Sequence, residues 1–117
     1  MSGQVDFDAL YDAFNARNIE AVLECLAQDV MWPNGWEGGM LYGREAVRDY
    51  WARQWAAVSP RVTPMGHIIE ADGRTAVHVR QTIRGLDGSL LSRGDVIHVY
   101  RVIGGLIRSM EIRGGAG

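Results

Sequence analysis

The feature that most constrains the fold of this chain is a change in hydrophobic periodicity near Pro60. Before Pro60, apolar residues recur at helical spacing, whereas after it β-branched residues alternate with polar ones. A chain of 117 residues has room for one hydrophobic core. Helices followed by strands are typical of the α+β class, in which a curved sheet covers its apolar face with the helices. We therefore predict a single domain over residues 1–113 and a flexible Gly-rich tail at 114–117.

The part of the chain before Pro60 predicts three helices. The first two form a hairpin, and Asn18 between them is a residue type that caps helix N-termini well. The third helix, at 44–58, has a strongly aromatic face. The three apolar stripes are Phe7, Leu10, Tyr11 and Phe14; Ile19, Val22, Leu23 and Leu26; and Val47, Tyr50, Trp51, Trp55 and Val58.

The part after Pro60 predicts four strands, joined by short turns that contain glycine. We place them at 61–70, 74–84, 90–102 and 106–113. Consecutive strands with short connections form an antiparallel meander.

Composition excludes several classes of function. Twelve basic and fourteen acidic residues give a net charge of −2, so neither nucleic acid nor a membrane surface is an expected partner. All twelve basic residues are arginine, which leaves no side-chain amine for Schiff-base catalysis. The single cysteine, Cys25, cannot close a disulfide within the chain and has no cationic neighbour in sequence that would activate it. The first residues lack the pattern of a signal peptide, so we expect a cytoplasmic protein.

Several short segments together resemble one family. They are 14–22 (FNARNIEAV), 29–32 (DVMW), 42–47 (YGREAV) and 105–107 (GLI). Their order and spacing resemble the SnoaL-like branch of the nuclear transport factor 2-like superfamily, which has the ketosteroid isomerase-like fold. The resemblance implies a cone-shaped barrel of a curved, mainly antiparallel sheet wrapped around three N-terminal helices, with a pocket between them. It also implies a homodimer through the sheet. Steroid isomerases, polyketide cyclases, epoxide hydrolases, dehydratases and non-catalytic binding proteins share this fold, so it does not define a reaction.

The residues of the steroid isomerases are not present here. Their catalytic base is an aspartate before a proline on the first strand, and that position is Trp32. Their oxyanion tyrosine aligns near Leu10, next to Tyr11, while the protonated acid aligns with His98. The epoxide hydrolase set does not align either, because the Arg-x-Asp pair at 93–95 falls on the wrong strand.

Strand parity selects the candidate catalytic residues. Residues two apart share a face of a strand, so His98 and Tyr100 lie together with Val96 and Val102. The resemblance places this face inside the barrel. A histidine has a pKa near neutrality and can act as general acid or base, and Tyr100 can orient a ligand oxygen or donate a proton. The alternative interpretation is a core histidine bonded to a neighbour, with Tyr100 packing the interior.

Aromatic residues are the candidate ligand contacts. Tryptophans surrounding a pocket suggest a flat, apolar ligand, although Trp51 or Trp55 can equally be ordinary core. Asn34 can bond a ligand carbonyl or hydroxyl, or can simply stabilise its Gly-rich turn. The full set of predicted ligand-binding residues is Trp32, Asn34, Trp36, Trp51, Trp55 and Met110.

We expect neither a metal nor a cofactor. His67, His78 and His98 fall on three different strands, and the parity that turns Val77 and Val79 inward turns His78 out. The charged residues of the opposite face suggest a solvated or dimer-facing surface, with Ile97, Val99 and Ile107 partly buried against a second subunit. That surface set is Arg80, Arg84, Arg93, Asp95, Arg101, Arg108, Glu111 and Arg113.

Two functions fit this pattern. The first is a small cofactor-free acid–base enzyme (an isomerase, cyclase, lyase or hydrolase) acting on an apolar oxygenated small molecule, with His98 as proton shuttle and Tyr100 or Asn34 as polariser. The second is a binding protein with the same pocket and no turnover, in which His98 is structural.

Overall fold

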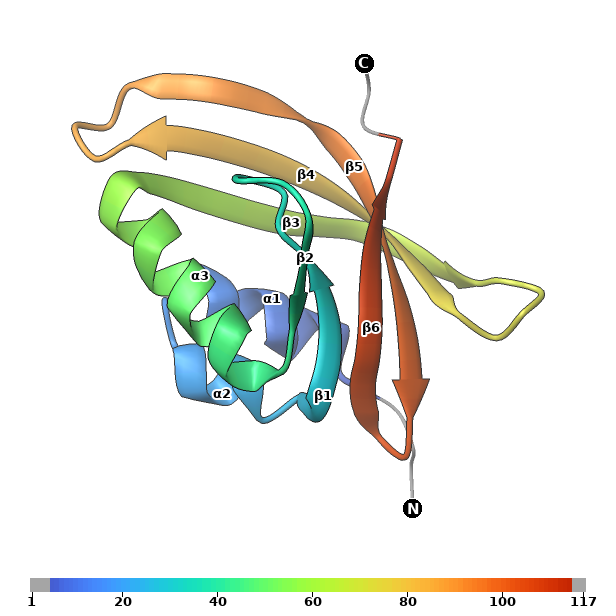
Figure 1. The fold of residues 1–117 in the computed structure, drawn as a ribbon. Coiled ribbons are helices and arrows are strands. Elements are labelled where there is room, and N and C mark those ends of the chain that lie inside the picture. Colours follow the sequence, from blue (N-terminus) through green and yellow to red (C-terminus); the bar gives the residue numbers. More distant parts are fainter. Residues whose placement is uncertain (1–4, 115–117) are drawn as a thin grey trace.

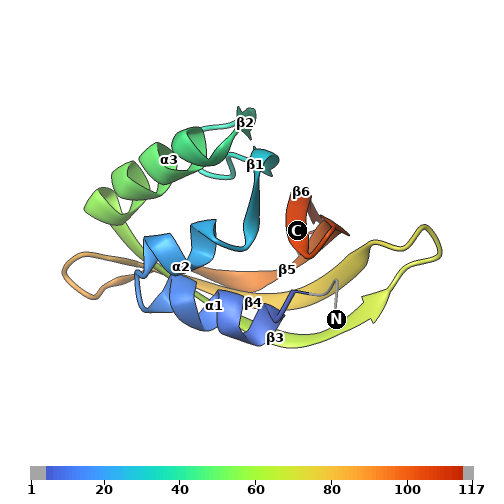
Figure 2. The ribbon, with the colours of Figure 1, turned by 90° about the horizontal axis from the view of Figure 1, so that it is seen from below.

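The computed structural model describes residues 5–114, which form one curved sheet with helices against its concave face (Figures 1 and 2). In chain order the elements are α1 (Phe7–Asn15), α2 (Ile19–Leu23), β1 (Leu26–Pro33), β2 (Met40–Tyr42), α3 (Arg44–Ala57), β3 (Val58–Ile69), β4 (Thr75–Gly85), β5 (Leu90–Ile103) and β6 (Leu106–Arg113). Apart from Gly114, the predicted Gly-rich tail lies outside the described residues.

The six strands are arranged in the order β2-β1-β6-β5-β4-β3. All neighbours are antiparallel except β1 and β6, which are parallel. This confirms the predicted α+β class and the curved sheet. The sheet stays open rather than closing into a barrel, because β2 and β3 remain its two edges (Figure 2).

The helix starts agree with their capping residues, but the second helix is shorter than its apolar stripe predicts. The Asp6 side chain accepts from the Ala9 N–H at 3.0 Å, and the Asn18 side chain accepts from the Ala21 N–H at 3.2 Å. Helix α2 ends at Leu23, and Leu26 instead begins β1. The reason is tertiary: the Cys25 carbonyl accepts from the Ile107 N–H of β6 at 2.7 Å, which draws this segment into the sheet.

The third helix begins where an arginine ties it to the first strand. The guanidinium of Arg44 donates to the Leu26 carbonyl from Nε at 2.8 Å and from Nη2 at 2.5 Å. Strand β2, which periodicity did not predict, immediately precedes this helix and pairs with β1 from Met31↔Tyr42 to Pro33↔Met40. Three residues are too few to give a recognisable alternation.

One prediction about the faces of the sheet is wrong. Ile107 was expected on the outer face, yet it is fully buried in the core together with Met110. The register of β6 shifts between Ser109↔Arg101 and Ile107↔Val102, so Arg108 is an extra residue that inverts the alternation. Val99 does lie on the outer face, but the single chain already buries it, so its burial requires no second subunit.

The core lies between the helices and the concave face of β1, β4, β5 and β6. Its members include Leu10, Val22, Leu26, Val30, Val47, Val77 and Val79. Val77 pairs with His98 and Val79 with Val96, so the predicted inward parity of β4 and β5 is confirmed. Within residues 5–114, no helix has both the length and the apolar character that crossing a membrane requires.

Candidate functional site

A cavity of about 600 Å³ lies between the helices and the concave face of the sheet. Most of the predicted site residues line it: Trp32, Trp36, Trp51, His98, Tyr100 and Met110. The walls are predominantly apolar, so a ligand in this space exchanges water for aromatic and aliphatic contacts.

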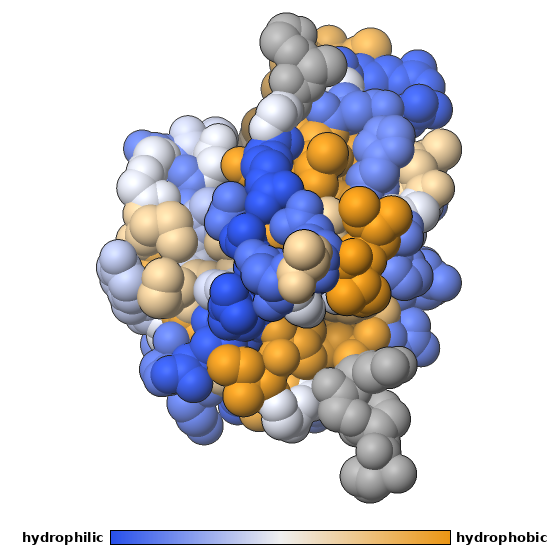
Figure 3. All heavy atoms as spheres, turned by 90° about the vertical axis from the view of Figure 1, so that its right-hand side faces the viewer, coloured by the Kyte–Doolittle hydropathy of each residue, from blue (hydrophilic) through white to orange (hydrophobic). Residues whose placement is uncertain are grey.

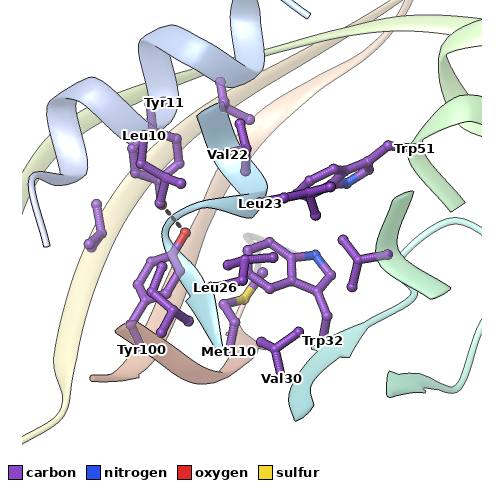
Figure 4. Packing of buried hydrophobic residues seen from close by; sticks show 14 of the residues in the cluster. Leu10, Tyr11, Val22, Leu23, Leu26, Val30, Trp32, Trp51, Tyr100 and Met110 are labelled. Carbon is purple, nitrogen blue, oxygen red and sulfur yellow. Dashed lines mark hydrogen bonds between the residues drawn. The ribbon is translucent and has the colours of Figure 1, made fainter. Parts of the chain in front are cut away.

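A chain of three polar side chains forms one wall of the cavity. The Tyr11 hydroxyl, from α1, lies 2.8 Å from Nδ1 of His98 and 2.8 Å from the Tyr100 hydroxyl, both on β5. The Tyr100 hydroxyl is also 3.5 Å from the same Nδ1 atom. Figure 4 shows Tyr11 reaching from its helix toward Tyr100, with the indoles of Trp32 and Trp51 on the other side of the packed cluster. The helix thus completes a network that β5 alone does not form.

Burial keeps all three of these side chains uncharged. It lowers the pKa of His98 from 6.5 to about 4. The pKa of Tyr11 is raised well above its usual range by burial and by the neighbouring Tyr100, and burial likewise raises the pKa of Tyr100. At neutral pH the imidazole therefore carries one proton, on either Nδ1 or Nε2.

The second ring nitrogen of His98, Nε2, has no hydrogen-bond partner within the described residues, whereas Nδ1 bonds Tyr11. Among the described residues, Nε1 of Trp55 is the one side-chain polar atom that is fully buried and has no hydrogen-bond partner. Nε2 of His98 is therefore not fully buried. Because His98 lines the cavity, its free nitrogen is available to a ligand there.

Two arrangements of protons satisfy the network. In one, Tyr100 donates to Tyr11, Tyr11 donates to Nδ1, and Nε2 carries the ring proton. In the other, Nδ1–H donates to Tyr11, Tyr11 donates to Tyr100, and Nε2 presents a lone pair. The second arrangement becomes the first when Nε2 accepts a proton from a ligand, protons move from Nδ1 to Tyr11 and from Tyr11 to Tyr100, and Tyr100 releases its own proton to the ligand. The protein stays uncharged, and the reverse sequence donates a proton from Nε2.

Three of the four tryptophans line the cavity, and the fourth, Trp55, packs behind Trp51. Trp51 packs edge-on against Trp32, with ring centroids 5.5 Å apart, and stacks on Trp55 at 5.8 Å. Trp55 does not line the cavity, so the structure places it behind Trp51 rather than against a ligand. Trp36 lines the cavity but is 42% exposed, which locates it at the opening.

Asn34 also does not line the cavity, because its side chain stabilises its own loop. Its Oδ1 accepts from the Glu37 N–H at 2.6 Å and from the Trp36 N–H at 3.2 Å. Its Nδ2 donates to Glu37 Oε1 at 2.9 Å, and Arg53 donates to the same carboxylate. The hydrogen-bonding atoms of Asn34 are thus occupied within the turn, and the structure gives it the turn role that its glycine and proline neighbours indicated.

Among the cavity residues that the predicted site did not include are the polar residues Tyr11 and Gln54. Tyr11 belongs to the apolar stripe of the first helix, and periodicity does not reveal that its hydroxyl reaches a strand 87 residues later. Gln54 is a buried polar residue that lines the cavity next to Trp51. The sequence did contain a signal for Gln54, because it is a polar residue on the aromatic face of the third helix and a buried amide needs hydrogen-bond partners.

The remaining candidate groups lie outside the cavity. His67 and His78 are exposed, and His78 pairs with Asp95 of β5 at 2.8 Å. In the part of the chain that the structure describes, no three histidine, cysteine or acidic side chains gather as a metal site. Burial raises the pKa of the Cys25 thiol, which opposes its use as a nucleophile.

The curved sheet and its covering helices have the ketosteroid isomerase-like, or nuclear transport factor 2-like, fold. The sequence places the chain more narrowly. The model of the SnoaL-like domain family matches residues 7–110, and the chain therefore belongs to that family.

Solved structures with the same fold include two with small ligands and one of a protein designed to bind a small molecule. TerC, co-crystallised with polyporic acid, is 25% identical, with a TM-score of 0.78, 92% of this chain covered and 86% of TerC. A computationally designed 17-OHP binder is 23% identical, with a TM-score of 0.76 and coverage of 91% and 87%. A protein of Catenulispora acidiphila in complex with trimethylamine is 18% identical, with a TM-score of 0.78 and coverage of 92% and 82%. No curated protein matches the chain.

Proposed function

We propose that this protein is a cofactor-free acid–base enzyme of the isomerase or cyclase type that acts on an apolar oxygenated small molecule. The observation that carries the proposal is the Tyr11 hydroxyl, bonded at 2.8 Å to both His98 Nδ1 and the Tyr100 hydroxyl on the wall of the cavity. This connection lets the imidazole and a phenol exchange protons through one intervening group. His98 and Tyr100 are the proposed catalytic residues, with Tyr11 between them.

The proposed step is the conversion of a ketone to its enol. Nε2 of His98 takes the proton from the carbon beside the carbonyl, and the electrons of that C–H bond form the new C=C bond. Nδ1–H passes its proton to Tyr11, Tyr11 passes its own to Tyr100, and Tyr100 donates to the substrate oxygen. No ion forms on the protein, which suits groups whose burial disfavours charge. Return of the proton to another carbon completes an isomerisation, and attack by the enol carbon on a second carbonyl completes a cyclisation.

The size and lining of the cavity support a flat substrate. About 600 Å³ is within the range of small-molecule sites, and the walls offer aromatic faces from Trp32, Trp36 and Trp51. The related structures that hold polyporic acid or were designed to bind 17-OHP support the same class of ligand. A lyase or hydrolase reaction on such a molecule would also need a general acid and a general base, which the same network can supply.

The test is hydrogen–deuterium exchange of β-tetralone, a flat apolar ketone, followed by NMR in heavy water. We expect saturable acceleration by the wild-type protein and a loss of about 100-fold or more in His98→Asn and Tyr11→Phe, the usual worth of a positioned acid–base group. His78→Asn is the matched control, since His78 is exposed on the outer face. Equal exchange in all four proteins would remove the network from catalysis.

The alternative function is ligand binding without turnover. One observation favours it: the cavity lacks an available carboxylate base within the described residues. Glu111 contributes to the lining, but its carboxylate accepts from Arg74 at 2.8 Å. Saturable binding of β-tetralone without any acceleration of exchange would support this function over the enzymatic one.

We further propose that the chain forms a homodimer through the sheet and works in the cytoplasm. Exposed apolar side chains on the outer face of β3 and β5 support the first proposal: Ile68, Ile97 and Ile103. Figure 3 shows apolar surface between hydrophilic bands on the side of the molecule that is at the right of Figure 1. Light scattering after gel filtration tests the dimer, and Ile97→Arg should convert it to a monomer.

A further inference from the structure

A second cavity, of about 380 Å³, lies outside the apolar site, at the end of the sheet where β3 begins. Four arginines line it: Arg17, Arg61, Arg84 and Arg93. The hydroxyl-bearing side chains Ser59 and Thr82 are also part of the lining, and none of the described residues that line it is acidic.

The strand register explains why these arginines converge. Thr82 of β4 pairs with Arg61 of β3 on one side and with Arg93 of β5 on the other, so all three share one face. Neighbouring strands are about 4.8 Å apart, which places the backbones of the two arginines about 10 Å apart, with the threonine between them. Ser59 pairs with Arg84, one pleat further along the same face.

Arg17 reaches this face from the helical layer and is fixed there. It occupies the connection between α1 and α2 with a positive φ of 63°. Its guanidinium donates to the Ser59 hydroxyl at 3.1 Å and to the Phe14 carbonyl at 3.3 Å, and it lies over the Trp55 ring at 5.2 Å. These contacts orient the guanidinium before any ligand arrives.

The four charges are not neutralised within the described chain. None of the four arginines forms an ion pair there, whereas Arg48, Arg53, Arg74, Arg80, Arg108 and Arg113 all do. The pKa of Arg17 is lowered by burial and by repulsion from Arg61, which indicates that the two cations are close. A protein with a net charge of −2 therefore concentrates unpaired positive charge at one cavity.

We propose that this cavity is an anion site that binds a phosphate group. Planar guanidinium groups bind phosphate oxygens in pairs of parallel hydrogen bonds, and the Thr82 hydroxyl between Arg61 and Arg93 can donate a further bond. Several cations around one cavity match a doubly charged tetrahedral anion better than a single carboxylate. The volume also leaves space beside the phosphate for a small organic group against Pro60 and Leu90. Pro60 lines the apolar cavity as well, so the two sites adjoin.

The experiment is a titration of the wild-type protein with inorganic phosphate at constant ionic strength, read by NMR at the arginine Nε–H groups. We expect saturable shifts confined to the four arginines. Arg61→Gln and Arg93→Gln should each weaken binding by about tenfold or more, since each removes a charge-assisted contact. Both side chains are exposed, so these variants should fold.

Arg101→Gln is the matched control, because Arg101 is an exposed arginine of the same strand as Arg93 but does not line the cavity. Unchanged binding in this variant supports a built site. Non-saturating shifts, shifts of similar size at Arg101, or equal binding in all three variants would overturn the proposal. Arginine signals that do not respond to phosphate would also overturn it, and this is the result expected if a second copy of the chain covers the cavity. The apolar cavity is not involved in any of these outcomes, so this proposal can fail independently of the catalytic one.

Discussion

The side-chain amide of Asn15 makes both hydrogen bonds that a neighbouring strand would make with Val62. Its Nδ2 donates to the Val62 carbonyl at 2.7 Å, and its Oδ1 accepts from the Val62 N–H at 2.9 Å. Val62 lies on β3, an edge of the sheet, so the last residue of α1 substitutes for a missing strand. This attachment fixes the helix that carries Tyr11 to the sheet that carries His98.

Replacing Asn15 with alanine should therefore lower the free energy of unfolding by about 1–3 kcal/mol, because two half-buried backbone groups lose their partners. Chemical denaturation measures this loss. Asn18→Ala is the comparison, since it removes one exposed N-cap bond, worth about 1 kcal/mol. A smaller loss for Asn15→Ala than for Asn18→Ala would show that the double bond does not anchor α1.

His98 should make the protein less stable in acid. Its pKa is about 4 in the folded state and 6.5 when exposed, so between these values the unfolded chain binds the additional proton. Above pH 6.5 His98 is neutral in both states and does not lower the free energy of unfolding. As the pH falls toward 4, protonation of His98 in the unfolded chain lowers that free energy by a total on the order of 3 kcal/mol. When the pH is lowered from 7 to 4, the free energy of unfolding should therefore fall less steeply in His98→Asn than in the wild type. Parallel curves for the two proteins would contradict the assignment.

Trp36 should contribute to ligand affinity and little to stability. It lines the cavity but remains 42% exposed, so Trp36→Ala should change the free energy of unfolding by less than about 0.5 kcal/mol. Loss of the aromatic contact should weaken β-tetralone binding about fivefold, a change that titration followed by NMR can measure. Tyr42→Ala is the control, because Tyr42 is an exposed aromatic residue outside the cavity lining. Equal affinities of both variants would place Trp36 outside the site.

Asn34 should act through the loop rather than on the ligand. Asn34→Ala removes the acceptor of the Trp36 and Glu37 amides, so those two amides should exchange with solvent faster. Affinity for β-tetralone should fall less than in Trp36→Ala. Hydrogen exchange and the same binding titration check both expectations. A large loss of affinity without faster exchange would instead indicate a direct contact between Asn34 and the ligand.

The apolar half of the site was more predictable than its polar half. The aromatic face of the third helix and the shared face of His98 and Tyr100 follow from helical and strand periods, which are local properties of the sequence. The roles of Tyr11 and Trp55 do not follow from these periods. Whether an aromatic residue lines a cavity or stands behind another one depends on how α1 and α3 sit against the sheet.

The amino-acid sequence alone determined the fold class, because apolar residues recur at helical spacing in α1 and α3 and alternate with polar residues after Pro60. The helical pattern before Pro60 did not predict β1 and β2, which also lie there. It also determined the family and the inward orientation of His98. Only the tertiary structure decided which groups meet: Tyr11 with His98 and Tyr100, Asn15 with Val62, and Ile107 with the core through the extra residue in β6. These relationships depend on chain crossings and strand register over long separations, and such contacts are fixed by packing the whole domain rather than by any local pattern.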